Sequence, residues 1–83
     1  MNFTYSKHSL EQIKRRNIPK SIVNTIINHP DKAISSEKCV KIFQKKIIEN
    51  KKKYLYRVFV NICKAPFLII TVYKTSKFEK YEN

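Results

Sequence analysis

The sequence of 83 residues contains no glycine and no tryptophan, and only six acidic residues stand against 18 lysines and arginines. Without glycine no glycine-rich phosphate loop can form, which excludes P-loop and Rossmann-type nucleotide sites. No apolar run approaches the ~18 residues of a membrane span, and the longest, from Ala65 to Val72, holds a proline and a threonine. The acids are scattered, so no carboxylate cluster for Mg²⁺ is expected and a metal-dependent nuclease is disfavoured.

Cysteine is also scarce. Cys39 and Cys63 are the two cysteines, and both lie within apolar strand patterns. With so little cysteine and no signal-peptide pattern, we expect reduced thiols in a cytoplasmic protein. A zinc site would have to combine them with His8 and His29, and these four residues include no short ligand pair. We therefore expect no metal and no cofactor.

The most abundant feature is positive charge. The formal net charge is +12, while 42% of the residues are hydrophobic and 12% aromatic, so the chain should fold, as one domain over residues 1–83. The positive electrostatic field of such a chain attracts polyanions. The candidate partners are nucleic acid, an anionic membrane surface and an acidic protein. An AT-rich genome also enriches lysine and asparagine, so composition alone leaves this choice open.

Two helices are expected in the N-terminal part, over about residues 6–16 and 19–29. Ser6 can cap the first helix with its hydroxyl, and Asn17 can adopt the left-handed conformation that would otherwise fall to glycine. The second helix has apolar residues at the i, i+3, i+4 spacing of a buried stripe. These residues are Ile22, Val23, Ile26 and Ile27.

The rest of the chain is predicted to be strand, over about residues 32–36, 39–48, 54–63 and 67–75. The fold class is therefore α+β, with two N-terminal helices packed on one face of a three- to four-stranded antiparallel sheet. Side chains two residues apart in a strand point the same way. This alternation assigns Val58, Val60, Ile62, Leu68, Ile70 and Val72 to the core. It assigns Arg57, Phe59, Asn61, Thr71, Tyr73 and Thr75 to the other, open face.

An arginine, hydroxyls and aromatic rings on one sheet face suit phosphate and RNA. Cleavage of RNA without metal is attack of a 2′-hydroxyl on the adjacent phosphorus, and it needs a base, an acid and cations for the phosphorane charge. We assign proton transfer to His8 and phosphate binding to Arg57 with Arg16. Thr71 and Tyr73 are supporting donors, with Tyr73 also a candidate acid. The expected RNA-binding residues are Lys14, Arg15, Lys45, Lys46, Lys51, Lys52, Lys53 and Phe59.

Plainer explanations exist for the same residues. His8, Gln12 and Arg15 recur at helical spacing, which is also what a solvated helix surface looks like. Thr71 and Tyr73 are residue types that strands favour in any case. The catalytic interpretation therefore depends on the helix face lying beside the sheet face that carries Arg57.

Several short motifs carry a resemblance to a known family. They are Tyr5-Ser6-Lys7-His8, Arg16-Asn17-Ile18, Ile22-Val23, His29-Pro30, Tyr56-Arg57-Val58 and Ile70-Thr71-Val72-Tyr73. Through them the chain resembles, over nearly its whole length, the DUF4258 family of small, mostly prokaryotic proteins. That family has a Ser-x-His start, an Arg-Gly-Ile at the end of the first helix, an arginine-containing strand and a closing Thr-Val-Tyr strand. The sequence departs from the pattern at Asn17, which replaces glycine, and at Gln12, where many members have arginine.

The resemblance implies a site made of His8, Arg16, Arg57, Thr71 and Tyr73. The order of helices and strands is also similar to that of RelE-type toxins and barnase-like, metal-independent ribonucleases. This similarity implies a toxin, a hydrolase acting on RNA, held inactive by an acidic antitoxin. The alternatives from other classes are a non-catalytic RNA-binding or regulatory module and a protein-interaction domain.

Overall fold

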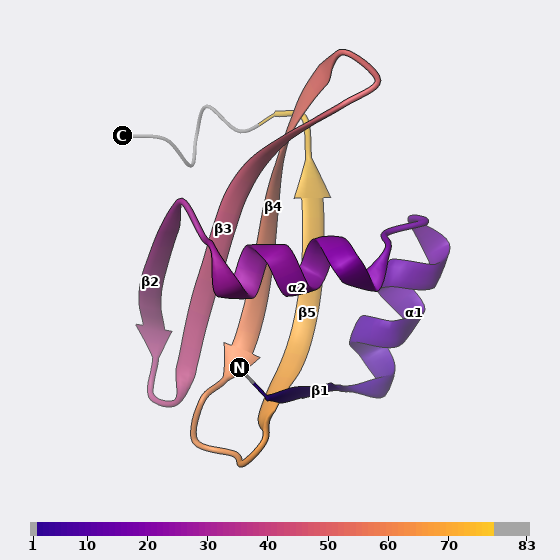
Figure 1. Ribbon diagram of the computed structural model, residues 1–83. Coiled ribbons are helices and arrows are strands. Elements are labelled where there is room, and N and C mark those ends of the chain that lie inside the picture. Colours follow the sequence, from indigo (N-terminus) through magenta and orange to yellow (C-terminus); the bar gives the residue numbers. More distant parts are fainter. Residues whose placement is uncertain (1, 78–83) are drawn as a thin grey trace.

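The computed structural model describes residues 2–77 and contains two helices and a five-stranded sheet (Figure 1). The sheet has the order β1-β5-β4-β3-β2, with β1 parallel to β5 and the other neighbours antiparallel. The elements in chain order are β1 (Phe3–Tyr5), α1 (Lys7–Arg15), α2 (Lys20–Asn28), β2 (Lys32–Glu37), β3 (Val40–Glu49), β4 (Lys52–Asn61) and β5 (Phe67–Thr75).

The predicted helix boundaries have visible local causes. The backbone N–H of Ser9 donates to the Ser6 hydroxyl at 3.1 Å, so Ser6 is the N-cap of α1. Asn17, two residues after α1, has a φ of 53°, the left-handed conformation expected of it. The end of α2 is followed by Pro30, which disfavours a helical conformation of the residue before it. Neither helix in the described part of the chain is long and apolar enough to cross a membrane.

The helices cover one face of the sheet, and α2 crosses β3, β4 and β5 (Figure 1). Val23, Ile26 and Ile27 form the buried side of α2. They pack against side chains from one face of the central strands, which removes apolar surface from water. The strand members of this core are Phe43, Tyr56, Val58, Val60, Ile69 and Val72.

The sheet differs from the prediction in two respects, because it has five strands and is mixed. The additional strand, β1, pairs Phe3, Thr4 and Tyr5 with Phe67, Leu68 and Ile69 of β5 in parallel. Three residues are too few to show an alternation, and a parallel partner about sixty residues away leaves no local signal.

A β-bulge changes which residues of β5 face the core. Phe59 is opposite Thr71, but the next residue, Val60, is opposite Ile69, so Ile70 is the additional residue in β5. The face predicted from strict alternation is therefore wrong before the bulge: Ile69 is fully buried, while Leu68 and Ile70 are half-buried. Ile62 lies beyond the end of β4 and is exposed.

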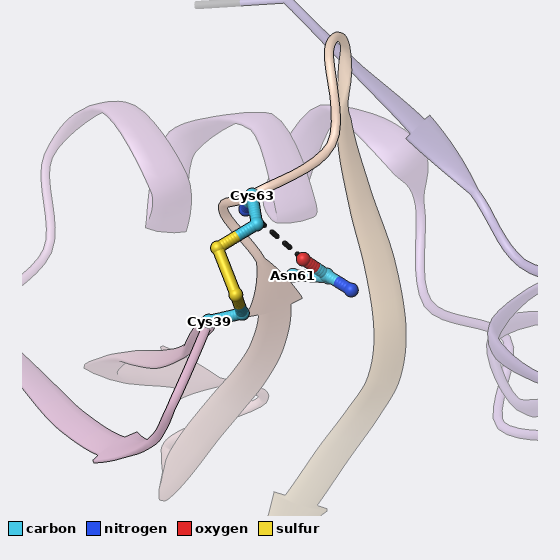
Figure 2. Close-up of a disulfide and its surroundings, with 3 residues drawn as sticks. All are labelled: Cys39, Asn61 and Cys63. Atoms are coloured by element: carbon cyan, nitrogen blue, oxygen red, sulfur yellow. Dashed lines mark hydrogen bonds between the residues drawn. A yellow bond between two sulfur atoms is a disulfide. The ribbon is translucent and has the colours of Figure 1, made fainter.

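The prediction of reduced cysteines is also wrong. Cys39 and Cys63 form a disulfide across a sequence separation of 24 residues (Figure 2). Cys39 lies in the turn between β2 and β3, and Cys63 lies in the loop after β4. Both were expected inside strands, where their pairing partner could not be seen. The two positions meet because consecutive antiparallel strands bring these two connections to the same end of the sheet (Figure 1).

Turns without glycine use other residues in left-handed conformations. The hairpin between β3 and β4 turns at Asn50 and Lys51, with φ values of 49° and 67°. Two successive positive φ values match the twist of the flanking strands, which is why this turn type normally attracts glycine and asparagine. Cys39 also has a positive φ, 72°, in the turn before β3.

Candidate functional site

Four side chains line a hollow on the sheet face opposite the helices. Arg57 and Phe59 come from β4, and Thr71 and Tyr73 come from β5. The pairing of the two strands places Arg57 opposite Tyr73 and Phe59 opposite Thr71, so the four form two adjacent rows. The hollow has a volume of about 350 Å³. The sequence predicted that these four residues share a face, and they do; we name the site the Arg57 pocket.

The orientation of Arg57 is set by its neighbours. Its Nε donates to the side-chain oxygen of Gln44 at 3.3 Å, and its guanidinium lies 5.4 Å from the centre of the Phe59 ring. Gln44 is opposite Arg57 in β3 and is itself 7% exposed. A guanidinium held at one edge and placed over a ring loses less freedom when it grips an anion. Sequence reasoning did not identify Gln44, because its role depends on the register between β3 and β4.

This face is less open than the sequence suggested. Ile42 pairs with Phe59 and lies on the same face, yet it is 5% exposed. Leu55, two residues before Arg57 in β4, is 2% exposed. Buried apolar side chains therefore lie on the same face as the pocket, whose own four residues are half-buried. Charges act more strongly beside such low-dielectric surfaces than in bulk water.

Helix α1 lies along the outer edge of β5 and satisfies backbone groups there. The Ser6 hydroxyl donates to the Ile70 carbonyl at 3.1 Å, and the Val72 N–H donates to the side-chain oxygen of Gln12 at 2.8 Å. Arg16 Nη1 donates to the Lys74 carbonyl at 3.2 Å. Gln12, the departure from the family pattern, is thus a structural acceptor at a position where many members have a cation.

Of the two site residues predicted on the first helix, neither lines the Arg57 pocket. His8 is exposed in the first turn of α1. Arg16 directs one guanidinium nitrogen to the strand edge, which is a structural role for a residue expected to hold phosphate. The sheet face therefore brings together Arg57, Thr71 and Tyr73 of the predicted site, while His8 and Arg16 lie outside the pocket.

The predicted RNA-binding lysines lie in different places. Lys45 contacts Asp31 at 3.3 Å and the His29 carbonyl at 2.9 Å, so it anchors the segment between α2 and β2. The backbone N–H of Lys46 donates to the other carboxylate oxygen of Asp31 at 2.8 Å. This hydrogen bond, followed by the contact with Lys45, lowers the pKa of Asp31. The remaining cations are exposed, on the last turn of α1 or at the hairpin tip; they are Lys14, Arg15, Lys51, Lys52 and Lys53.

A second polar cluster lies on the helix-covered face, beyond the helices, and was not predicted. The phenol of Tyr56 donates to the carboxylate of Glu49, which also contacts Lys74 at 3.1 Å. The Lys74 ammonium lies 4.4 Å from the centre of the Tyr54 ring. Burial, and then the contact with Glu49, raises the pKa of Tyr56, while the hydrogen bond from Tyr56 lowers the pKa of Glu49. Each member has a partner, which suits a structural brace.

Among residues 2–77, no three histidine, cysteine or acidic side chains gather as metal ligands would. The fold and the pocket define a small basic α+β domain with an arginine and aromatic side chains on the second face of its sheet. The chain belongs to the DUF4258 family, described as a domain of unknown function, whose family model matches residues 5–74. No curated protein and no solved structure matches the chain.

Proposed function

We propose that this protein binds single-stranded RNA, with a phosphate and the adjacent nucleotide in the Arg57 pocket. The observation that carries the proposal is the convergence of Arg57, Phe59, Thr71 and Tyr73 on one hollow. A guanidinium presents several N–H donors to phosphate oxygens, and hydroxyls add further donors. Aromatic rings provide surfaces on which unpaired bases stack.

The charge of the chain supports the same ligand class. A net charge of +12 on 83 residues attracts a polyanion over a longer range than the pocket itself. The exposed lysines at Lys51–Lys53 extend this attraction to the tip of the β3–β4 hairpin. The pocket then supplies the local contact, and the distributed lysines supply sequence-independent affinity.

The test is binding of a fluorescent oligouridine RNA of about 12 nucleotides, a typical length for single-strand sites. We expect Arg57→Ala to weaken binding by about tenfold or more, since a charge-assisted contact contributes roughly 1.5–3 kcal/mol. Lys20→Ala is the matched control, because it removes one positive charge from the helix α2. Equal losses in both variants would show that only net charge matters and would contradict the pocket assignment.

A second candidate function is metal-independent cleavage of the bound RNA. One observation favours it: Gln12 contacts the N–H of Val72, the residue between Thr71 and Tyr73. His8 precedes Gln12 by one helical turn, so it lies on a helix fastened to the strand that carries half of the pocket. In this mechanism His8 accepts or returns the proton, Arg57 stabilises the phosphorane and Tyr73 is the partner acid.

Cleavage has a distinctive product. Attack by the 2′-hydroxyl releases a 2′,3′-cyclic phosphate end, and a substrate with 2′-deoxy sugars cannot react. We expect cleavage to persist in a chelator and to be lost in His8→Ala while RNA binding remains. Binding without any cleavage would leave the protein as a non-catalytic RNA-binding or regulatory module.

The predicted similarity to RelE-type toxins, which no matching solved structure supports, suggests a biological setting, a toxin held inactive by an acidic antitoxin. The basic surface fits an acidic partner, which would compete with RNA for the same cations. Regulated expression in a bacterial host tests this setting: growth arrest with RNA fragmentation is expected for wild type and not for Arg57→Ala. Normal growth at confirmed soluble expression would exclude the toxin. A cytoplasmic location stays a prediction, and the disulfide does not favour it, since cytoplasmic thiols are normally kept reduced.

A further inference from the structure

The disulfide joins two connections at the end of the sheet. Cys39 and Cys63 have their Cα atoms 5.2 Å apart, and the bond is the covalent link between the β2–β3 turn and the β4–β5 loop (Figure 2). Cys63 is exposed and Cys39 is half-buried. Each is adjacent in sequence to a lysine, Lys38 on one side and Lys64 on the other. The disulfide therefore lies at the surface of the described structure.

These surroundings suit thiol–disulfide exchange. A thiolate of glutathione attacks one sulfur, forms a mixed disulfide and releases the other cysteine as a thiolate. The thiolate of a second glutathione then attacks the glutathione sulfur of the mixed disulfide. Glutathione disulfide leaves, the bonded cysteine is released as a thiolate, and the protein has gained two electrons and two protons. Lys38 and Lys64 also add positive charge to these two connections, and an ammonium group that approaches a cysteine sulfur would stabilise its thiolate.

The disulfide is connected to the Arg57 pocket through the end of β4. The N–H of Cys63 donates to the side-chain oxygen of Asn61 at 3.0 Å, as Figure 2 shows, and the N–H of Ile62 donates to the Cys39 carbonyl at 2.8 Å. Asn61 is the last residue of β4 and follows Phe59 by two positions. Phe59 faces Thr71 at the β-bulge, where the register between β4 and β5 changes.

A register change is held in place by the pairing on either side of it. On the side toward the loop, β4 and β5 have two paired positions, Val60 with Ile69 and Asn61 with Leu68. The disulfide holds the connection beyond these pairs against the β2–β3 turn. Val60 and Ile69 are fully buried, and these strands are also paired with β3 and β1, so the core still holds this end of the sheet. If the disulfide constraint is released, the connection beyond these pairs opens more often, and the bulge that positions Phe59 against Thr71 is held less firmly.

We propose that the Cys39–Cys63 pair is a thiol–disulfide switch for the Arg57 pocket, binding-competent when oxidised and weakened when reduced. The proposal rests on the proposed RNA-binding function and adds its regulation. The chain-entropy model gives the scale: for a separation of 24 residues, loss of the cross-link raises the unfolding equilibrium constant roughly 300-fold. In a domain of 83 residues, whose total stability is small, that change is a large fraction of the whole.

The experiment measures two quantities in glutathione buffers set from fully oxidising to fully reducing. One is amide hydrogen exchange of the protein alone, and the other is its affinity for the oligouridine RNA. On reduction we expect exchange at Phe59, Val60 and Thr71 to accelerate by about tenfold or more, because these amides lie beside the released end of the sheet. We expect the affinity for RNA to fall by a similar factor. The variant with Cys39→Ser and Cys63→Ser should resemble the reduced protein in every buffer.

The two measurements separate the switch from the proposed function. If exchange accelerates only in the loop of residues 62–66 and RNA affinity is constant, the disulfide is a structural cross-link and the switch is excluded. If no RNA binds in either state, the proposed function fails, and the switch of RNA affinity fails with it. Hydrogen exchange then tests only the structural part of the proposal: acceleration at Phe59 and Thr71 would show that the disulfide controls the order of the pocket, and restriction to the loop would exclude this. A redox response that persists in the double serine variant would also exclude it.

Discussion

The side-chain oxygen of Gln12 accepts a hydrogen bond from the backbone N–H of Val72 at 2.8 Å, and this contact fastens α1 to the edge of β5. Ser6 and Arg16 bond the carbonyls on either side, so three side chains of one segment replace a neighbouring strand. A strand edge covered in this way cannot recruit another chain. The same contact ties the helix that carries His8 to the strand that carries Thr71 and Tyr73.

Removal of the Gln12 acceptor should therefore destabilise the fold. In Gln12→Ala the N–H of Val72 loses its partner in a partly buried position, which costs about 1–3 kcal/mol. Gln12→Glu keeps an acceptor oxygen and should retain most of the stability. Urea denaturation of the three proteins measures the free energies of unfolding. A free energy of unfolding of Gln12→Ala equal to that of the wild type would mean that the contact contributes nothing.

Stability should fall in acid partly because of Glu49. Its pKa is lowered, first by the hydrogen bond from Tyr56 and then by Lys74, so the carboxylate is favoured in the folded state. Such a group stabilises the fold above its unfolded pKa of about 4.3, and that contribution is lost as the pH falls through the lower folded pKa. Glu49→Gln should flatten the fall in thermal midpoint between about pH 5 and pH 2. An unchanged slope would assign the acid sensitivity to other carboxylates, such as Asp31.

The raised pKa of Tyr56 predicts that the stability of the fold also decreases in alkali. Burial raises its pKa, and so does the adjacent carboxylate of Glu49, so the neutral phenol is favoured in the folded state. The stabilisation is complete below the unfolded pKa of about 10 and is lost as the pH rises above that value. Absorbance of the phenolate should show one tyrosine that ionises together with unfolding. Tyr56→Phe should lack this coupled step, whereas Tyr54→Phe should keep it.

The lysines at the hairpin tip should act on RNA through charge rather than through specific contacts. Replacement of Lys51, Lys52 and Lys53 by glutamine should reduce the dependence of log affinity on log salt by up to about two, at roughly 0.7 for each phosphate that is no longer neutralised. Binding at low salt should weaken for all RNA sequences alike. If the salt dependence is unchanged, the tip does not contact the nucleic acid. Arg57→Ala, by contrast, should lower affinity with a change in slope of less than about one.

Local patterns in the sequence were sufficient for much of the fold. The Ser6 hydroxyl, the left-handed tendency of asparagine at Asn17 and the apolar spacing of α2 define helices through contacts within a few residues. The alternation of apolar and polar residues in the last third of the chain predicted that Arg57, Thr71 and Tyr73 share one face of the sheet, and there they line the pocket. Such features depend only on geometry that each segment carries by itself.

Tertiary structure decided everything that depends on how distant segments meet. The β1 strand, the bulge at Ile70 and the contact between Gln44 and Arg57 all follow from register, which a single strand does not specify. The partnership of Cys39 with Cys63 likewise required two connections 24 residues apart to reach the same end of the sheet. The sequence by itself thus determined the helices and the shared face of Arg57, Thr71 and Tyr73. Pairing between strands determined the facing of residues before the bulge and which side chains touch, because only the folded chain fixes distances between residues far apart in sequence.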